Sequence, residues 1–167
     1  TIKTSLGPKG IDKMLVDTMG DITVTNDGAT ILKEMDVQHP AAKMMVQVAK
    51  SVDNEVGDGT TSAVVISAAL LKEAEELINM GLHPTVVLDG YRKALAKSLK
   101  ILEEIAMPID FNDDENLKKI AITSMRSKVV SGSAEFLAGL AVKALKQITE
   151  KVDGALKADI NFVKVDK

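Results

Sequence analysis

Residues 55–62, Glu-Val-Gly-Asp-Gly-Thr-Thr-Ser, combine two glycines, a carboxylate and three hydroxyl groups immediately before a long apolar run. Glycine lets the backbone approach a ligand closely, and the N–H groups at a helix start attract anions such as phosphate. Asp58 would repel a phosphate, so its presence makes most sense with a hard cation such as Mg²⁺ between the two. The pattern therefore indicates a combined anion and metal site.

The same residues also have a purely structural explanation. A glycine turn followed by an Asp or Thr N-cap begins many helices, and a cap is the commoner meaning of so short a motif. The choice between a helix cap and a ligand site therefore depends on the other segments of the chain.

A second acidic, glycine-flanked helix start occurs at Asn26-Asp27-Gly28. It follows two short β-leaning runs, residues 13–16 and 22–25, which predict a small hairpin. A helix is expected directly afterwards, over residues 29–35. An ordinary strand-to-helix turn would explain Asp27 without any chemistry.

A tight turn is expected near the beginning of the chain, where the helix-like residues 2–6 run into Leu6-Gly7-Pro8. Gly7 suits the left-handed conformation that ends a helix, and Pro8 cannot continue the helical hydrogen bonds. The backbone of this turn should therefore be exposed.

Apolar periodicity predicts three long helices, from 41 to about 55, from 60 to 81 and from 84 to about 105. The last two should form an antiparallel pair, and we expect the helix that begins at residue 60 to be largely interior. His39 and His83 each precede a proline at a first helical position. Neither histidine has the spacing of a metal ligand, so both should be structural.

The composition changes over residues 106–112, where a proline and several polar residues interrupt the helical pattern. We expect a domain boundary there, which divides the chain into residues 1–112 and 113–167. The second part should contain a helix from 113 to 125, a helix capped by Ser133 that runs to about 152, and a strand over 160–167. Lys128 lies in a small polar loop and could reach an anion, although a solvated lysine is the commoner role.

The composition limits the function classes. The chain has 167 residues, 46% of them hydrophobic but only 2% aromatic, and a formal net charge of −3, with no basic stripe. Nucleic acid is therefore not an expected partner. No apolar run reaches the roughly 18–20 residues that span a bilayer, so no membrane partner is expected. The absence of cysteine excludes disulfides and thiolate chemistry, and a cytoplasmic protein is the default.

Three motifs together resemble the nucleotide site of chaperonins: Leu6-Gly7-Pro8-Lys9-Gly10, Asn26-Asp27-Gly28-Ala29-Thr30-Ile31-Leu32 and Gly57-Asp58-Gly59-Thr60-Thr61-Ser62. The similarity in order and spacing extends across the whole chain. Asn26 stands where bacterial-type chaperonins carry a lysine, and residues 39–43, His-Pro-Ala-Ala-Lys, are typical of the other branch. The chain is thus similar to the group II chaperonins, the archaeal thermosome and its eukaryotic cytosolic relatives.

The resemblance implies a mainly α (α+β) fold. Residues 1–112 would be the N-terminal part of an ATP-binding equatorial domain, with long antiparallel helices and a small β-hairpin. Residues 113–167 would be the first part of an intermediate domain. Both parts are expected to be incomplete, so this chain alone is expected not to hydrolyse ATP.

The resemblance also implies a role for individual residues. Asp58 would bind Mg²⁺, Asp27 would position the attacking water, and these two would be the catalytic residues. Lys128 would sense the γ-phosphate from the second domain. The residues implied to bind ATP or ADP are Leu6, Gly7, Pro8, Asp27, Gly28, Gly59, Thr60, Thr61, Ser62 and Lys128.

The implied function is that of an ATP-dependent chaperone subunit. Together with other subunits of a double ring, it would use ATP hydrolysis to drive closure around non-native client proteins. An alternative of another class is a helical scaffold or assembly fragment of such a ring without catalysis. A kinase or P-loop enzyme fits poorly, because the chain has no Gly-x-x-x-x-Gly-Lys-[Ser/Thr] and residues 57–59 lack the final glycine of a kinase loop.

Overall fold

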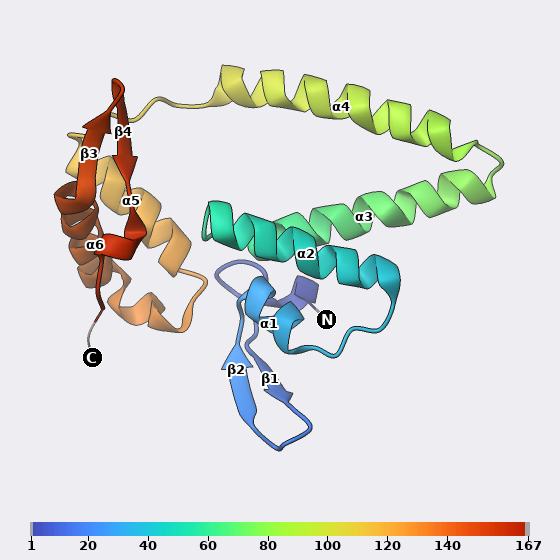
Figure 1. Ribbon diagram of the computed structural model, residues 1–167, viewed down its shortest axis with the longest axis horizontal. Helices are drawn as coiled ribbons and strands as arrows, with labels where there is room; N and C mark the ends of the chain where they lie inside the picture. Colours follow the sequence, from blue (N-terminus) through green and yellow to red (C-terminus); the bar gives the residue numbers. More distant parts are fainter. Residues whose placement is uncertain (1, 166–167) are drawn as a thin grey trace. The chain divides into compact units, whose positions relative to one another are not determined.

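The computed structural model describes residues 2–165, which are mainly helical with two small antiparallel sheets (Figure 1). This confirms the fold class expected from the sequence. The chain divides into two compact units, Thr1–Pro108 and Ile109–Lys167. The division falls within residues 106–112, where the amino-acid composition changes. Each unit is described below by itself.

Residues 2–108, the described part of the first unit, contain one short 3₁₀ helix, one hairpin and four α-helices. In chain order these are η1 (Ile2–Ser5), β1 (Lys13–Val16), β2 (Ile22–Thr25), α1 (Gly28–Glu34), α2 (Pro40–Glu55), α3 (Thr60–Asn79) and α4 (Pro84–Ile105). The second unit contains α5 (Asp114–Met125), η2 (Val129–Ser133), α6 (Ala134–Ile148), β3 (Thr149–Val152), β4 (Ala155–Ala158) and η3 (Ile160–Phe162).

The hairpin of the first unit has the strands that the sequence predicts. Lys13 pairs with Thr25 at one end of the register, and Val16 pairs with Ile22 at the other. The turn is organised by Asp17, whose Oδ1 accepts hydrogen bonds of 2.8 Å from two backbone amides further along the turn. Only Asn26 and Asp27 separate the end of β2 from the start of α1.

The core of the first unit lies where α1, α2 and α3 meet. Its buried members are small or medium-sized, namely Ala29 and Leu32 of α1, Ala49 of α2 and Val64 of α3. Ile2 of η1 packs against this group, so η1 is held onto α1 and α3. This core fixes the first turns of α1 and α3 relative to each other.

The prediction that α3 is largely interior is wrong for the described residues. Only Thr60 and Val64, in its first turns, are buried, whereas Ile66 and Leu70 are exposed. Helices α3 and α4 meet at their connecting loop and diverge away from it, so α4 covers little of α3 (Figure 1). Apolar periodicity identified the helix correctly, but burial depends on the neighbours that cover it.

The α3–α4 pair is nevertheless held at one point. The Tyr91 hydroxyl of α4 donates a 2.6 Å hydrogen bond to the carbonyl oxygen of Leu70 in α3, and Val87 one turn earlier is buried. The apolar residues of α4 beyond Tyr91 are exposed. The antiparallel helical pair predicted from the sequence is thus present, with contact near its connecting loop.

The second unit is built on the packing of α5 against α6. Ala134, Ala138 and Val142 form the buried stripe of α6. Ser133 occupies the predicted N-cap position of α6 but makes no side-chain capping bond. Asp113 caps α5 by accepting a hydrogen bond from the Asn116 amide at 3.0 Å.

Two predictions for the second unit are wrong. Helix α6 ends at Ile148 rather than near 152, because β3 and β4 form a hairpin around the Asp153-Gly154 turn. Both turn residues have positive φ, as a two-residue hairpin turn requires. Residues 160–165 form no strand, and the first three of them form η3, which the Asp159 side chain caps. Residues 166 and 167 of the predicted strand lie outside the described residues.

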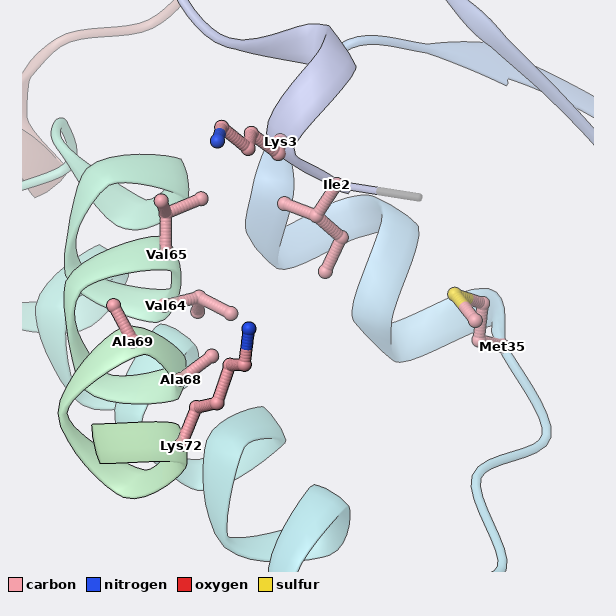
Figure 2. Close-up of a pocket in the computed structure, with 8 residues that line it drawn as sticks. All are labelled: Ile2, Lys3, Met35, Val64, Val65, Ala68, Ala69 and Lys72. Atoms are coloured by element: carbon pink, nitrogen blue, oxygen red, sulfur yellow. The ribbon is translucent and has the colours of Figure 1, made fainter. Parts of the chain in front are cut away.

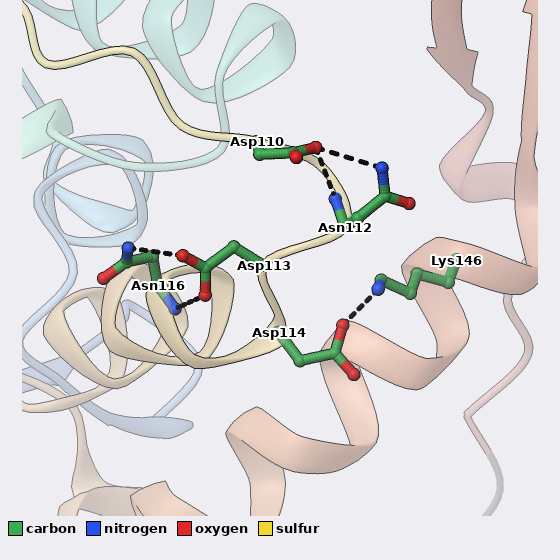
Figure 3. Close-up of polar contacts among 6 residues, drawn as sticks. All are labelled: Asp110, Asn112, Asp113, Asp114, Asn116 and Lys146. Atoms are coloured by element: carbon green, nitrogen blue, oxygen red, sulfur yellow. Dashed lines mark hydrogen bonds and ion pairs between the residues drawn. The ribbon is translucent and has the colours of Figure 1, made fainter.

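Polar contacts fix the beginning of the second unit (Figure 3). Asp114 pairs with Lys146 of α6, and the Lys146 ammonium lies 5.7 Å from the centre of the Phe111 ring. The Asp110 carboxylate accepts hydrogen bonds from the backbone amide and the side chain of Asn112. Through Lys146, α6 thus contacts both the start of α5 and the segment that precedes it. Among the helices in the described part of the chain, none combines the length and the apolar character required to cross a membrane.

The close packing of α1 on α3 leads to a prediction about two glycines. A Cβ atom at Gly28 would lie 2.9 Å from the Thr61 backbone nitrogen, whereas a Cβ at Gly90 of α4 meets nothing within 4 Å. Gly28→Ala should therefore lower the free energy of unfolding by about 1–3 kcal/mol. Gly90→Ala, the matched control, should raise it by about 0.5–1 kcal/mol. Denaturant unfolding checks both, and equal tolerance of the two substitutions would contradict the packing.

Candidate functional site

The N-termini of α1 and α3 meet at the centre of the first unit. Gly28, the first residue of α1, is buried against Thr61 of α3, and an added Cβ would lie 2.6 Å from the Thr61 Oγ1. Only a residue without a side chain allows so close an approach. The fold therefore brings together the two acidic, glycine-flanked helix starts that the sequence singled out.

Asp27 links these two helix starts. It is the N-cap of α1, where its Oδ2 accepts hydrogen bonds from the Thr30 amide at 3.0 Å and the Thr30 hydroxyl at 3.1 Å. Its Oδ1 accepts a hydrogen bond from the Thr60 hydroxyl at 3.3 Å. The structural role expected for Asp27 in a strand-to-helix turn is thus confirmed. Asp27 also contacts α3 through Thr60, which is only 3% exposed.

Asp58 does not cap α3. The N-cap of α3 is Gly59, which has φ of 77° and makes no side-chain capping bond. The exposed Asp58 carboxylate accepts a 2.8 Å hydrogen bond from the adjacent Gly59 amide. The hydroxyl of Thr60 is directed to Asp27 rather than to the start of its own helix. The explanation of this motif by an Asp or Thr N-cap is therefore wrong.

The start of α3 consequently presents amides without a side-chain cap beside an exposed carboxylate. The first N–H groups of a helix have no intrahelical partner and carry the positive end of the helix dipole. Those of Thr60, Thr61 and Ser62 occupy this position in a helix of 20 residues. Such an arrangement suits a phosphate group accompanied by a cation.

The Leu6-Gly7-Pro8 turn lies next to η1 and has the expected geometry. Gly7 has φ of 80°, its carbonyl oxygen accepts from the Gly10 amide at 2.9 Å, and Leu6 and Pro8 are exposed. Because η1 packs against α1 and α3, the turn adjoins the elements that carry Asp27 and Asp58. No hydrogen bond among the described residues joins this turn to residues 59–62.

A largely apolar groove of about 430 Å³ lies between η1, the end of α1 and α3 (Figure 2). Lys3 and Lys72 approach it from opposite sides, and the rest of its lining is aliphatic or Met35. The groove begins at Val64, one turn beyond the start of α3. It therefore flanks the helix terminus rather than containing Asp27 or Asp58.

Lys128 belongs to the second unit. It lies between α5 and η2, is half-buried, and donates its backbone N–H to the Met125 carbonyl oxygen at 3.0 Å. Its contact with a phosphate held by the first unit stays a prediction.

The side chains of the described residues do not by themselves form a complete metal site. No group of three or more His, Asp or Glu side chains in residues 2–165 could hold a metal ion. Mg²⁺ is commonly bound through one or two carboxylates together with substrate phosphates, so the single exposed carboxylate of Asp58 fits that mode. His39 and His83 are instead N-caps, each with Nδ1 accepting a backbone amide, which confirms their structural role.

Two residues that contact Asp27 were not singled out from the sequence. Thr30 donates both its amide and its hydroxyl to Asp27, and the Thr25 hydroxyl accepts from the Asp27 amide at 3.1 Å. The spacing of Asp27 and Thr30, which is that of an N-cap and the third helical residue, is the signal that could have identified Thr30.

The model of the TCP-1/cpn60 chaperonin family matches residues 1–167. A thermosome subunit alpha of Archaeoglobus fulgidus is 56% identical over 99% of this chain and 30% of that protein. A thermosome subunit beta of Desulfurococcus mucosus is 57% identical over 99% of this chain and 32% of that protein. A thermosome subunit beta of Thermococcus kodakarensis is 55% identical over the whole chain and 31% of that protein.

These matches confirm the resemblance that the three motifs indicated. The chain spans about a third of the length of the curated relatives that it matches. Because the family model covers every residue, the two helix starts around Asp27 and Asp58 lie within the match. The chain belongs to the TCP-1/cpn60 chaperonin family.

Proposed function

We propose that this chain is the nucleotide-binding part of an ATP-dependent chaperonin subunit. It binds Mg-ATP, and hydrolysis drives closure of a double ring of such subunits around a non-native protein in the cytoplasm. The observation that carries this proposal is the exposed Asp58 carboxylate beside the start of α3, which has no side-chain cap. Asp58 caps no helix, and beyond its local hydrogen bond from the Gly59 amide the exposed carboxylate is available to a metal ion that accompanies a phosphate.

Phosphate binding is assigned to the first turn of α3. The backbone amides of Thr60, Thr61 and Ser62 point out of a helix N-terminus, where the helix dipole favours negative charge. Gly59 has a positive φ, a backbone conformation that favours glycine. Because glycine has no side chain, the approach to these amides is open. The hydroxyl of Ser62 adds a donor of the type that binds phosphate oxygens.

The metal is assigned to Asp58. Its carboxylate offers the hard oxygen ligand that Mg²⁺ prefers, and the ion would neutralise phosphate charge as it develops during hydrolysis. Asp58 itself holds the ion next to the amides of α3. The presence of one carboxylate, rather than a cage, agrees with the usual binding of Mg²⁺ through substrate phosphates.

Asp27 is assigned to the attacking water. Oδ2 of its carboxylate accepts two hydrogen bonds from Thr30. Oδ1 accepts one from Thr60, the first residue of α3, where the phosphates bind. A fixed carboxylate in this place can orient a water molecule and accept its proton. Gly28 permits the close packing that sets this distance, and the Leu6-Gly7-Pro8 turn lines the nucleotide.

Lys128 is assigned to sensing the γ-phosphate. It belongs to the second unit, which we propose to be the first part of an intermediate domain, the first unit being the N-terminal part of the equatorial domain. A lysine that reaches the phosphate only when the two domains approach would couple the nucleotide state to closure.

A second candidate function is a helical assembly element of the ring without catalysis. It is favoured by the exposed apolar residues of α3 and α4, among them Ile66, Leu70, Leu95 and Leu99. Such surfaces commonly mark protein–protein contacts. Mg-dependent nucleotide binding separates the two functions, because an assembly element needs none.

Asp58→Ala tests the metal role. The substitution should weaken Mg-ATP binding by at least about 10- to 100-fold, and binding of ATP in the presence of EDTA should change little. Folding should be nearly unaffected, since Asp58 caps no helix. Titration calorimetry measures the affinity. Asp53→Ala, which removes another exposed carboxylate near the end of α2, is the matched control and should bind Mg-ATP as the native protein does.

Unchanged Mg-ATP affinity in a folded Asp58→Ala protein would contradict the metal role. The same loss of affinity in Asp53→Ala would show that a general effect of charge is responsible.

Lys128→Ala tests the coupling role. The variant should still bind ATP in the assembled protein but should not close, because its contact with the nucleotide arises only on closure. Protection from protease on addition of ATP measures closure. Lys119→Ala, on the exposed face of α5, is the control and should retain protection. Full ATP-dependent protection of Lys128→Ala would exclude Lys128 as the sensor.

A further inference from the structure

Four Asp-Gly pairs occur in the chain: Asp27-Gly28, Asp58-Gly59, Asp89-Gly90 and Asp153-Gly154. In such a pair the glycine nitrogen can attack the carboxyl carbon of the aspartate before it, because glycine has no side chain to hinder the approach. The attack requires an amide that no rigid element holds and a backbone that can turn. The surroundings of each pair therefore decide whether it reacts.

Two of the pairs are held by helices. Gly28 begins α1 and lies so close to Thr61 that even a Cβ atom would not fit. Gly90 lies inside α4, where its amide belongs to the helical hydrogen bonds. Neither nitrogen can reach the preceding aspartate without disturbing its helix, so the Asp27 and Asp89 pairs should be protected in the folded protein.

The Asp58-Gly59 pair lies outside any helix or strand, between the end of α2 and the start of α3, and both residues are exposed. The Gly59 amide donates a 2.8 Å hydrogen bond to Oδ1 of Asp58, so its nitrogen faces the carboxyl group that it would attack. Gly57 and Gly59 both have positive φ, and a Cβ at Gly59 would meet nothing within 4 Å. The turn is therefore uncrowded around the reacting atoms.

The start of α3 also favours the charge that this attack produces. Negative charge develops on the carboxyl oxygens of Asp58 as the nitrogen bonds to the carbon. The positive end of the α3 dipole lies directly after Gly59, which is the N-cap of that helix. A fixed dipole next to developing negative charge lowers the barrier to its formation.

We propose that Asp58-Gly59 is a site of spontaneous isomerisation through a cyclic imide. The Gly59 nitrogen bonds to Cγ of Asp58, and one carboxyl oxygen leaves as water together with the amide proton and one proton from the solvent. Addition of water to the ring then breaks one of its two C–N bonds. Cleavage at Cγ restores aspartate, whereas cleavage at the backbone carbonyl carbon gives isoaspartate.

Isoaspartate changes the position of the charge at residue 58. The chain then runs through the former side chain, which lengthens the backbone by one carbon, and the carboxylate is attached directly to Cα. A carboxylate displaced in this way no longer meets a metal ion beside the amides of α3. This effect on metal binding rests on the proposed function, whereas the modification itself does not.

Peptide mapping by mass spectrometry tests the modification in the folded, nucleotide-free native protein during prolonged warm incubation at neutral pH. The imide has lost one water, and a protease that cuts before aspartate leaves isoaspartate uncut. Products should accumulate at Asp58 at least about 10-fold faster than at Asp27 or Asp89, because orientation of the reacting groups changes rates by that much or more. In denaturant the three rates should converge. Equal rates at the three sites in the folded protein would overturn the proposal.

Asp58→Glu provides a second check, because the longer side chain would have to close a larger ring. Its residue 58 should remain unmodified over the same incubation. Modification of Asp58→Glu at the native rate would show that another reaction is responsible, and would also overturn the proposal.

The effect on binding is measured separately, with Asp153→Gly as the matched control. This variant removes another exposed Asp-Gly pair, and glycine accepts the positive φ of residue 153. Mg-ATP binding by both proteins should fall in proportion to the isoaspartate formed at residue 58, and Mg-ADP should slow the reaction at Asp58 but not at Asp153. If isoaspartate accumulates at Asp58 while Mg-ATP binding persists, the modification stands and the metal role in the proposed function fails.

Discussion

The site depends on the absence of a side chain at Gly28. A Cβ atom there would lie within 2.9 Å of the Thr61 backbone, so no other residue lets α1 start against α3 without displacement. This approach places the Asp27 carboxylate within hydrogen-bond reach of Thr60, a residue 33 positions away in the sequence. The small side chains of the surrounding core, such as Ala29 and Ala49, allow the same close packing of the helices. The role proposed for Asp27, which is to act on water beside the start of α3, requires this contact.

The two acidic residues differ in how the fold uses them. Asp27 is tied to both helices and serves as an N-cap, so its structural and chemical roles coincide in one side chain. Asp58 is exposed and caps no helix, and a phosphate bound beside its carboxylate would require a cation between the two. A carboxylate held rigidly suits the orientation of a water molecule, whereas an accessible one suits a metal that arrives with its nucleotide.

Local patterns in the sequence predicted the elements well, because capping and periodicity act within a few residues. Both strands of the first hairpin and the ends of α4 were predicted as observed, with proline after His83 marking a helix start. The burial of α3 and the contact of Gly28 with Thr61 were not predictable in this way, since both depend on residues distant in sequence. The end of α6 was missed because the Asp153-Gly154 pair was not recognised as a hairpin turn, in which both residues have positive φ.

We expect the meeting point of α1 and α3 to hold Mg-nucleotide. A crystal structure of the native protein with Mg²⁺ and a non-hydrolysable ATP analogue tests this most directly. We expect phosphate oxygens about 2.7–3.2 Å from the amides of Thr60, Thr61 and Ser62. We also expect Mg²⁺ about 2.0–2.1 Å from an Asp58 carboxylate oxygen. A nucleotide bound away from the start of α3, or a metal held without Asp58, would contradict it.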